Sequence, residues 1–216
     1  MKRLYKFYSD KWALDAVKKR RLKVATLDDL NDPFEFIADT TNNADQRRLW
    51  HKASKGVFSQ NGLISFSRSC KNPVLWSHYA DRHRGVAIGF DVRSEFVVPV
   101  VYRKGRPTLP DLRQMTSNAR RSAIELTTRT KFLHWEYEAE SRVFVKLDAQ
   151  DEGTGLYFKA FGSDLVLREV ILGVRSELTS QKIHSELGPQ DVKITTARLA
   201  FKTYSVVAQR NPALQK

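Results

Sequence analysis

The chain contains a single cysteine, Cys70, among its 216 residues, and it has no long hydrophobic run. One thiol excludes an internal disulfide framework and a metal site built from several cysteines. The first residues, Met-Lys-Arg-Leu-Tyr-Lys-Phe, carry positive charge without the apolar stretch of a signal peptide, and no segment has the length of a membrane span. We therefore expect a cytoplasmic protein that has no membrane partner.

Several enzyme signatures are also missing. The sequence has no P-loop, no dinucleotide-type Gly-x-Gly-x-x-Gly and no His-Glu-x-x-His zinc motif. It has no internal repeat and no low-complexity linker, and its length suits one domain with a sizeable core. We predict a single domain over residues 1–216, with a polar C-terminal tail that is frayed from about residue 209.

Positive charge is abundant. Lysine and arginine number 37 against 24 aspartates and glutamates, which gives a formal net charge of +13. Such an excess favours a polyanionic partner, above all nucleic acid, or an acidic protein that masks the charge. A basic protein without such a partner is the alternative interpretation.

Hydrophobic periodicity predicts an α+β fold, a mixed and mostly antiparallel sheet with packed helices. The almost continuously apolar residues 86–91 indicate a central strand, and Pro99 indicates an edge or bulged strand. Asn72-Pro73 is a good helix start, and Ser176 is a candidate cap for a late helix. Strands are predicted at 4–9, 22–26, 62–69, 86–91, 96–102, 132–145, 156–161, 165–174, 192–196 and 201–207, and helices at 10–21, 43–56, 73–80, 110–130 and 176–187.

The stretch Phe132 to Val145 alternates like a single β-strand. Alternation would place three carboxylates and a guanidinium on one face, and like charges at close range are unfavourable unless a cation, a ligand or solvent compensates them. The stretch therefore indicates either an edge strand with its charges in water or a functional site. The predicted polar face consists of Glu136, Glu138, Glu140 and Arg142, followed by Phe144.

Three other stretches carry polar side chains with two interpretations each. Asn31-Asp32-Pro33 has the chemistry of a structural turn, and Asn31 and Asp32 are also candidate site residues. Ser65 and Ser67 alternate with larger residues, so their strand face either accommodates a ligand or packs on another element. His78, a lone histidine on a predicted helix, is more often a structural residue than a catalyst.

Taken together, several motifs resemble a bacterial family of domains of unknown function, over roughly residues 4 to 190. The motifs are Leu-Tyr-Lys at 4–6, Asn-Asp-Pro-Phe-Glu at 31–35, Phe-Ser at 66–67, Leu-Trp-Ser-His-Tyr-Ala at 75–80 with Arg-Gly at 84–85 and Gly-Phe-Asp at 89–91, and Trp-Glu-Tyr-Glu-Ala-Glu-Ser-Arg at 135–142. As a set they are specific to that family, but they do not state an activity.

More distantly, the order of parts is similar to the ADP-ribosyltransferase superfamily. That resemblance implies a first strand with a cation for NAD, here Lys6, a second strand with serines, here Ser65-Phe66-Ser67, and a third with a catalytic Glu-x-Glu, here Glu138-Ala139-Glu140. Lysine replaces the superfamily's arginine or histidine, and phenylalanine replaces its threonine.

The resemblance implies a role for each matching residue. Glu140 would be the catalytic carboxylate that stabilises the positive charge on the ribose of NAD, and Glu138 would orient or deprotonate the attacking group. Ser67 would hold Glu140, Lys6 and Arg142 would contact the pyrophosphate, and Trp76 or Tyr79 would stack on a flat ring. The full set of expected NAD-binding residues is Tyr5, Lys6, Asn31, Asp32, Ser65, Ser67, Trp76, His78, Tyr79 and Arg142.

The expected function is that of a single catalytic domain, a mono-ADP-ribosyltransferase that uses NAD as substrate and nucleic acid as acceptor, with RNA preferred to DNA. A role as a toxin or phage-defence effector, with an acidic antitoxin or immunity protein, fits this chemistry. Two alternatives stay open. One is a basic nucleic-acid-binding module without chemistry, and the other is a nuclease in which Asp32, Glu35, Glu138 and Glu140 bind Mg²⁺.

Overall fold

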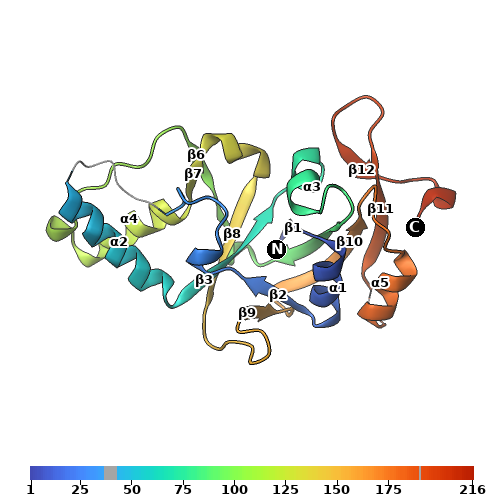
Figure 1. The fold of residues 1–216 in the computed structure, drawn as a ribbon, viewed down its shortest axis with the longest axis horizontal. Coiled ribbons are helices and arrows are strands. Elements are labelled where there is room, and N and C mark those ends of the chain that lie inside the picture. The colour runs from blue at the N-terminus through green and yellow to red at the C-terminus, as the bar shows by residue number, and fades with distance from the viewer. Residues whose placement is uncertain (37–42, 190) are drawn as a thin grey trace.

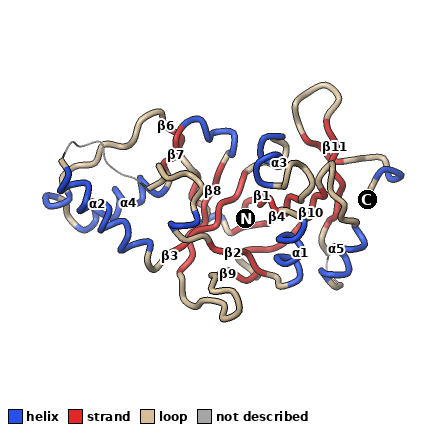
Figure 2. Tube along the Cα trace, in the orientation of Figure 1, coloured by secondary structure: helices blue, strands red, loops and turns tan. Residues whose placement is uncertain are grey.

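The computed structural model describes residues 1–36, 43–189 and 191–216. Its centre is a curled eight-stranded sheet (Figures 1 and 2), in which every pair of neighbours is antiparallel except β10 with β11. The predicted α+β class is thus confirmed. In spatial order the strands are β12 (Val206–Ala208), β11 (Lys193–Leu199), β10 (Leu165–Leu172), β4 (Val86–Val92), β1 (Lys2–Tyr8), β3 (Asn61–Ser67), β8 (Glu140–Lys146) and β5 (Val98–Pro99).

Two small sheets and five α-helices complete the described part of the chain. The small sheets are the antiparallel pair β2 (Arg21–Val24) and β9 (Tyr157–Ala160) and the parallel pair β6 (Val101–Arg103) and β7 (Thr130–Phe132). Helices α2 (Ala44–Phe58) and α4 (Ser117–Thr128) lie at one end of the molecule, and α5 (Ser180–Leu187) lies at the other (Figure 1). The other two helices are α1 (Asp10–Lys18) and α3 (Pro73–Tyr79).

The main core packs on both faces of the apolar strand β4. The sheet order confirms the prediction that this strand is central. Val86, Ile88 and Phe90 are fully buried on one face, where α1 and α5 cover them, and Ala87 is buried on the other face beside Trp76 of α3. A strand that is covered on both faces gains burial energy from most of its residues, which explains its almost continuously apolar sequence. A separate small core between α2 and α4 contains Trp50, Leu109, Leu112 and Ala123.

Local capping chemistry explains where two helices begin. The Asn72 side chain accepts a hydrogen bond from the Val74 amide at 2.9 Å, so the predicted start of α3 is confirmed. The prediction that Ser176 caps the late helix is wrong, because Thr179 caps α5. The Ser176 hydroxyl instead donates to the Asp10 carboxylate at 3.2 Å and so ties the loop before α5 to α1.

Two predicted elements are shorter than expected. The helix expected at 110–130 is α-helical only from Ser117, since Asp111 caps a separate 3₁₀ turn at Leu112–Gln114. The strand expected at 96–102 is divided between β5 and β6, and β5, which contains Pro99, is an edge strand of the large sheet. This division agrees with the expected effect of proline on strand pairing.

The prediction of one strand over Phe132 to Val145 is wrong. After β7 the chain forms a 3₁₀ helix, η4 (Leu133–Glu138), and Ala139 has a left-handed backbone conformation with φ 45° before β8 begins. The expected row of three carboxylates is therefore absent, because Glu136 is exposed on η4 while Glu138 is buried. The change of direction at Ala139 thus separates Glu136, which is in solvent, from Glu138 and Glu140, which are both buried.

The tail beyond residue 209 also differs from the expectation of fraying. The Gln209 amide donates to the Thr196 carbonyl at 2.7 Å, and the Lys216 amide donates to the Thr196 hydroxyl at 2.9 Å. The Lys216 ammonium donates to the carbonyl oxygens of Val174, at 3.2 Å, and Ser176. These contacts hold the polar tail against β11 and the loop after β10. In the described residues, no helix combines the length and the apolar character needed to cross a membrane.

We predict that Gly85→Ala destabilises the protein by about 3 kcal/mol or more. The added methyl group would clash with backbone atoms, which cannot move away as a flexible side chain can. A Cβ at Gly85 would lie 1.9 Å from the Tyr8 carbonyl oxygen, where the turn after α3 meets the end of β1. Gly56→Ala in α2 is the matched control, because nothing lies within 4 Å of its added Cβ. Urea unfolding should show the control gaining about 0.5–1 kcal/mol, and equal stability of the two variants would contradict this account.

A buried ion-pair cluster beside an acidic cavity

Five charged side chains form a buried network, which we call the ion-pair cluster: Glu35, Lys131, Glu138, Glu140 and Arg142. Lys131 of β7 is its centre. Its Nζ lies 3.1 Å from Glu35 Oε1, 2.5 Å from Glu138 Oε2 and 3.2 Å from Glu140 Oε2. Each side chain is less than a tenth exposed, so water screens these charges weakly.

Arg142 of β8 fixes the orientation of Glu140. Its Nε donates to Glu140 Oε1 at 2.8 Å and its Nη2 donates to Glu140 Oε2 at 3.1 Å, which is a bidentate pairing. Nη1 donates to the Thr128 carbonyl at 2.8 Å at the end of α4, and Nη2 also contacts Glu35. Because these donors are already engaged, the guanidinium acts as a rigid support for the Glu140 carboxylate.

These contacts determine the ionisation of the cluster. Burial alone would raise the pKa of Glu140, but the charge and hydrogen bonds of Arg142 and the charge of Lys131 outweigh it and lower this pKa to about 2. Burial likewise disfavours the charged form of Lys131, yet the charges of Glu140, Glu35 and Glu138 raise its pKa. Glu140 is therefore a fixed anion at physiological pH.

The cluster borders a cavity of about 230 Å³, which we call the acidic cavity. Five carboxylates and two lysines line it, so acidic side chains outnumber basic ones in the lining. Nine of the twelve site residues expected from the sequence lie in its lining: Tyr5, Lys6, Asn31, Asp32, Ser65, Ser67, Tyr79, Glu138 and Glu140. Aromatic rings in the lining come from Tyr5, Phe7, Phe66, Tyr79 and Trp135.

Strand register explains why the distant motifs meet at this cavity. The strands β1, β3 and β8 are neighbours in the sheet, and their pairing aligns Tyr5 with Ser67 and Ser67 with Glu140. One residue from each motif therefore occupies a single row across three strands. The sequence order of the motifs alone did not specify this alignment.

Lys6 is the cation of β1 at the acidic cavity. Its Nζ donates to the Ser65 carbonyl oxygen at 3.2 Å. Burial lowers the pKa of Lys6 to about 8, although the charge of Glu140 opposes this change. Lys6 thus changes its charge in a pH range that an assay can reach.

Glu138 receives two hydrogen bonds at the cavity wall. The Tyr79 hydroxyl donates to its Oε1 at 2.5 Å, and Lys131 occupies its Oε2. Burial, with the contact to Glu138, raises the pKa of Tyr79, so this hydroxyl stays a donor. These bonds connect α3 to η4 across the cavity.

The Asn-Asp-Pro stretch serves as both a turn and a wall of the acidic cavity. Asp32 Oδ1 accepts a hydrogen bond from the Phe34 amide at 2.8 Å, which is the predicted turn chemistry. Its other oxygen, Oδ2, accepts from Trp135 Nε1 at 2.9 Å and connects the turn to η4. The two interpretations of this stretch are therefore compatible.

Four expected roles differ from the observed positions. Trp76 is fully buried, donates to the Cys70 carbonyl at 2.7 Å and packs against Phe7, so it does not face the acidic cavity. His78 is exposed and lies beside Tyr137. Ser67 donates to the Ser69 carbonyl at 2.9 Å and not to Glu140. Arg142 lies behind Glu140, outside the cavity lining, where its donors contact Glu140, Glu35 and the Thr128 carbonyl.

Sequence reasoning did not single out Lys131, the centre of the cluster. It lies between the helix expected at 110–130 and the strand expected from Phe132. No pattern distinguishes it, because its burial results from the parallel pairing of β7 with β6, which joins segments almost 30 residues apart. Glu35 was considered only as a ligand for Mg²⁺.

The carboxylates already have a cationic partner. Lys131 Nζ occupies the space between Glu35, Glu138 and Glu140 where a divalent ion would be bound. Within residues 1–36, 43–189 and 191–216, no group of three or more histidine, cysteine, aspartate or glutamate side chains is arranged to hold a metal. Comparisons with protein-family models, curated proteins and solved structures gave no match to this chain.

We predict that the protein loses stability in acid because Glu140 becomes protonated there. A folded-state pKa near 2, below the ordinary value of 4.5, means that the unfolded chain binds a proton first as the pH falls. The stability that ionised Glu140 contributes is thus complete above about pH 5 and is lost towards pH 2. In urea unfolding, the difference in free energy of unfolding between wild type and Glu140→Gln should shrink as the pH falls over this range. A difference independent of pH would refute the assignment, and the exposed Glu136→Gln serves as control.

Proposed function

We propose that this chain is a mono-ADP-ribosyltransferase that transfers ADP-ribose from NAD to nucleic acid, with RNA preferred to DNA. The observation that carries the proposal is the carboxylate of Glu140, held ionised at the wall of an acidic, aromatic-lined cavity. The row of Tyr5, Ser67 and Glu140 across adjacent strands supports an ADP-ribosyltransferase-like arrangement of the three motifs. A bacterial toxin or phage-defence effector, restrained by an acidic antitoxin or immunity protein, is the biological role that we propose.

The chemistry uses the negative charge of the cavity. When the bond between ribose C1 and nicotinamide breaks, its electron pair leaves with nicotinamide and the sugar becomes positively charged. A fixed anion stabilises that charge most in a site that excludes water. Glu140 fits this role because Arg142 holds its carboxylate in one orientation and its low pKa keeps it ionised. The acceptor then forms a bond to C1 and loses a proton.

The size of the cavity indicates how NAD would lie. About 230 Å³ is less than the roughly 300 Å³ at the lower end of ligand pockets, so the cavity encloses only part of a dinucleotide. We place the positively charged nicotinamide ring and its ribose inside, where Tyr79 and Trp135 offer flat faces for the ring. The pyrophosphate would lie towards Lys6, the cation of β1 in the lining.

Glu138 is assigned a positioning role in this proposal. Both of its oxygens accept hydrogen bonds, from Tyr79 and from Lys131, so it is held firmly next to Glu140. From this position it would orient the attacking group of the acceptor.

A binding module without chemistry is the second candidate, and a specific observation favours it. Glu138 and Glu140 are fully paired with Lys131 and Arg142, which is the arrangement expected if the carboxylates serve only as structural partners. Salt-sensitive binding of nucleic acid without release of nicotinamide would favour this candidate. A magnesium-dependent nuclease is less well supported, because Lys131 occupies the space between the carboxylates.

We predict that Glu140→Gln lowers the transfer of label from NAD by about 100-fold or more, by analogy with the loss of other electrostatic groups in active sites. Purified protein would be incubated with labelled NAD and separate pools of RNA, DNA and cell protein. Label in one pool with wild type and with the exposed-site control Glu136→Gln, but not with Glu140→Gln, identifies the acceptor class. Full activity of a folded Glu140→Gln protein would exclude this catalytic role.

We predict that the affinity for NAD weakens as the pH rises through about 8, because Lys6 loses its positive charge there. The affinity falls and does not rise with pH, because burial favours the neutral amine of Lys6 and a neutral amine does not attract the pyrophosphate. Lys6→Arg retains its charge over the same range, since arginine does not deprotonate in proteins. Calorimetric titration of NAD from pH 7 to about pH 9.5 should show an affinity that declines with pH for wild type and stays constant for the variant. Parallel profiles would remove Lys6 from the NAD site.

A further inference from the structure

A second cavity, of about 300 Å³, adjoins the acidic cavity. The two share three lining residues, Asp32, Glu35 and Lys131, so they meet at the ion-pair cluster. The remaining lining comes from the end of β6 and the segment after it, from the end of α4, from β7 and from Phe34 and Phe36 of the turn. None of the residues expected from the sequence to bind NAD, apart from Asp32, belongs to this second cavity.

The second cavity has exposed aromatic rings at its edge. Phe34 is 64% exposed and Phe132 is 46% exposed, although both are large apolar side chains. The Phe132 ring stacks on His134, with ring centroids 4.7 Å apart and planes 20° from parallel. Exposed flat rings beside cations are the surfaces on which unpaired bases stack.

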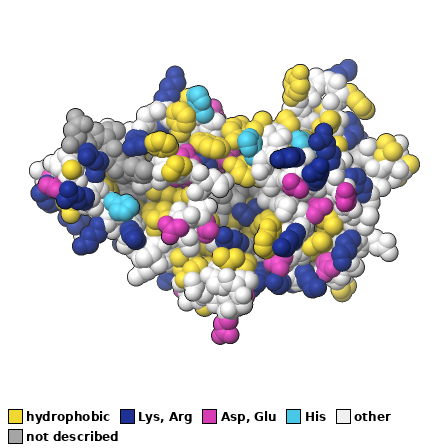
Figure 3. Space-filling view, in the orientation of Figure 1, with side chains coloured by type: hydrophobic (Ala, Val, Ile, Leu, Met, Phe, Trp, Pro, Cys, Tyr) yellow, Lys and Arg dark blue, Asp and Glu magenta, His cyan; other side chains and the backbone are white. Residues whose placement is uncertain are grey.

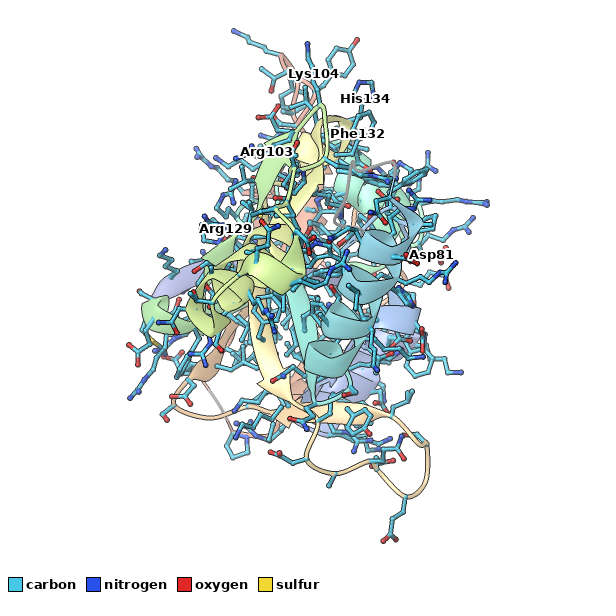
Figure 4. The ribbon with its side chains drawn as sticks, turned by 90° about the vertical axis from the view of Figure 1, so that its left-hand side faces the viewer. Asp81, Arg103, Lys104, Arg129, Phe132 and His134 are labelled. Atoms are coloured by element: carbon cyan, nitrogen blue, oxygen red, sulfur yellow. The ribbon has the colours of Figure 1, made fainter. Side chains whose placement is uncertain are left out.

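Cations surround these rings. Arg103, Lys104 and Arg106 belong to the lining, and Arg106 lies over the Phe34 ring at 5.2 Å. Figure 4 shows Arg103 and Lys104 on the same side of the molecule as Phe132 and His134, with Arg129 below them. In the space-filling view, hydrophobic, basic and histidine side chains gather above β6 and β7 (Figure 3). Within the described parts of the chain, none of these four cations forms an ion pair with a carboxylate.

We propose that the second cavity receives an unpaired base of single-stranded nucleic acid. The base stacks on Phe132 or Phe34, and the phosphates on either side of it contact Arg103, Lys104 and Arg129. A base inside a duplex cannot reach such a cavity unless it leaves the stack, so a single strand is the better ligand. The role of this strand as acceptor rests on the proposed function, whereas its binding does not.

The side chains that line both cavities connect the second cavity to the proposed reaction. A base stacked there would present an edge towards Glu35 and Lys131, which also border the acidic cavity. The acceptor and the ribose of NAD would thus approach from two sides of the same side chains. An acidic protein segment would satisfy the cations, but it would leave the exposed rings without a flat partner, which is why we favour nucleic acid.

The test measures binding of a short fluorescent RNA, as a single strand and as a duplex, by anisotropy at several salt concentrations. Phe132→Ala should weaken single-strand binding by about tenfold, as expected for the loss of one stacked base. Arg103→Ala should reduce the salt slope by about 0.7, the change expected for one lost phosphate contact on a single strand. Phe201→Ala and Lys202→Ala, on the exposed hairpin between β11 and β12, are the matched controls and should bind like wild type.

Three outcomes would overturn the proposal: equal affinity for single strand and duplex, equal effects of Phe132→Ala and Phe201→Ala, or Phe132-dependent binding of an oligoglutamate peptide and not of RNA. Nicotinamide release from NAD is measured separately with wild-type protein. Release without the expected binding pattern refutes the cavity assignment and leaves the proposed reaction intact. The expected binding pattern without release supports the cavity assignment and refutes the reaction.

Discussion

The pairing of Arg142 with Glu140 is the interaction on which the rest of the site depends. A carboxylate buried in β8 would be neutralised without a cation nearby, and its charge would then be unavailable for chemistry. Arg142 provides that cation from the same strand and also bonds the Thr128 carbonyl, so it fastens α4 to the large sheet. Removing one partner of such a pair costs about 3–5 kcal/mol, because the other charge is left buried and alone. Stability and function are therefore tied to the same atoms.

Lys131 extends this arrangement from a pair to a network. It comes from β7, which is outside the large sheet, and it contacts carboxylates from the Asn-Asp-Pro turn, η4 and β8. Three segments that have little apolar surface in common are thus joined by charge. The two cavities lie against this junction, which explains why both have Glu35 and Lys131 in their linings.

Features with a local cause were predictable from the sequence, and features with a tertiary cause were not. Asn72-Pro73 and the apolar run of β4 were recognised because capping and burial leave patterns within a few residues. The alternation after Phe132 suggested a strand, but the burial of Glu138 and the left-handed Ala139 depend on Lys131, which approaches from β7. Trp76 was a candidate for stacking because the sequence does not distinguish an aromatic residue in a core from one in a binding site. Its position was decided by Phe7 and Cys70, which sequence alone does not place beside it.

The order of β1, β3 and β8 in the sheet has a consequence for synthesis of the protein. Tyr5 is made among the first residues, yet Glu140, which completes its row, belongs to a strand that begins at residue 140, and β3 must pair with both neighbours before the row is complete. At roughly 5–20 residues per second, a ribosome needs several seconds to make that interval. A nascent or truncated chain that ends before β8 has no ion-pair cluster, so any activity of this site begins only when translation is well advanced.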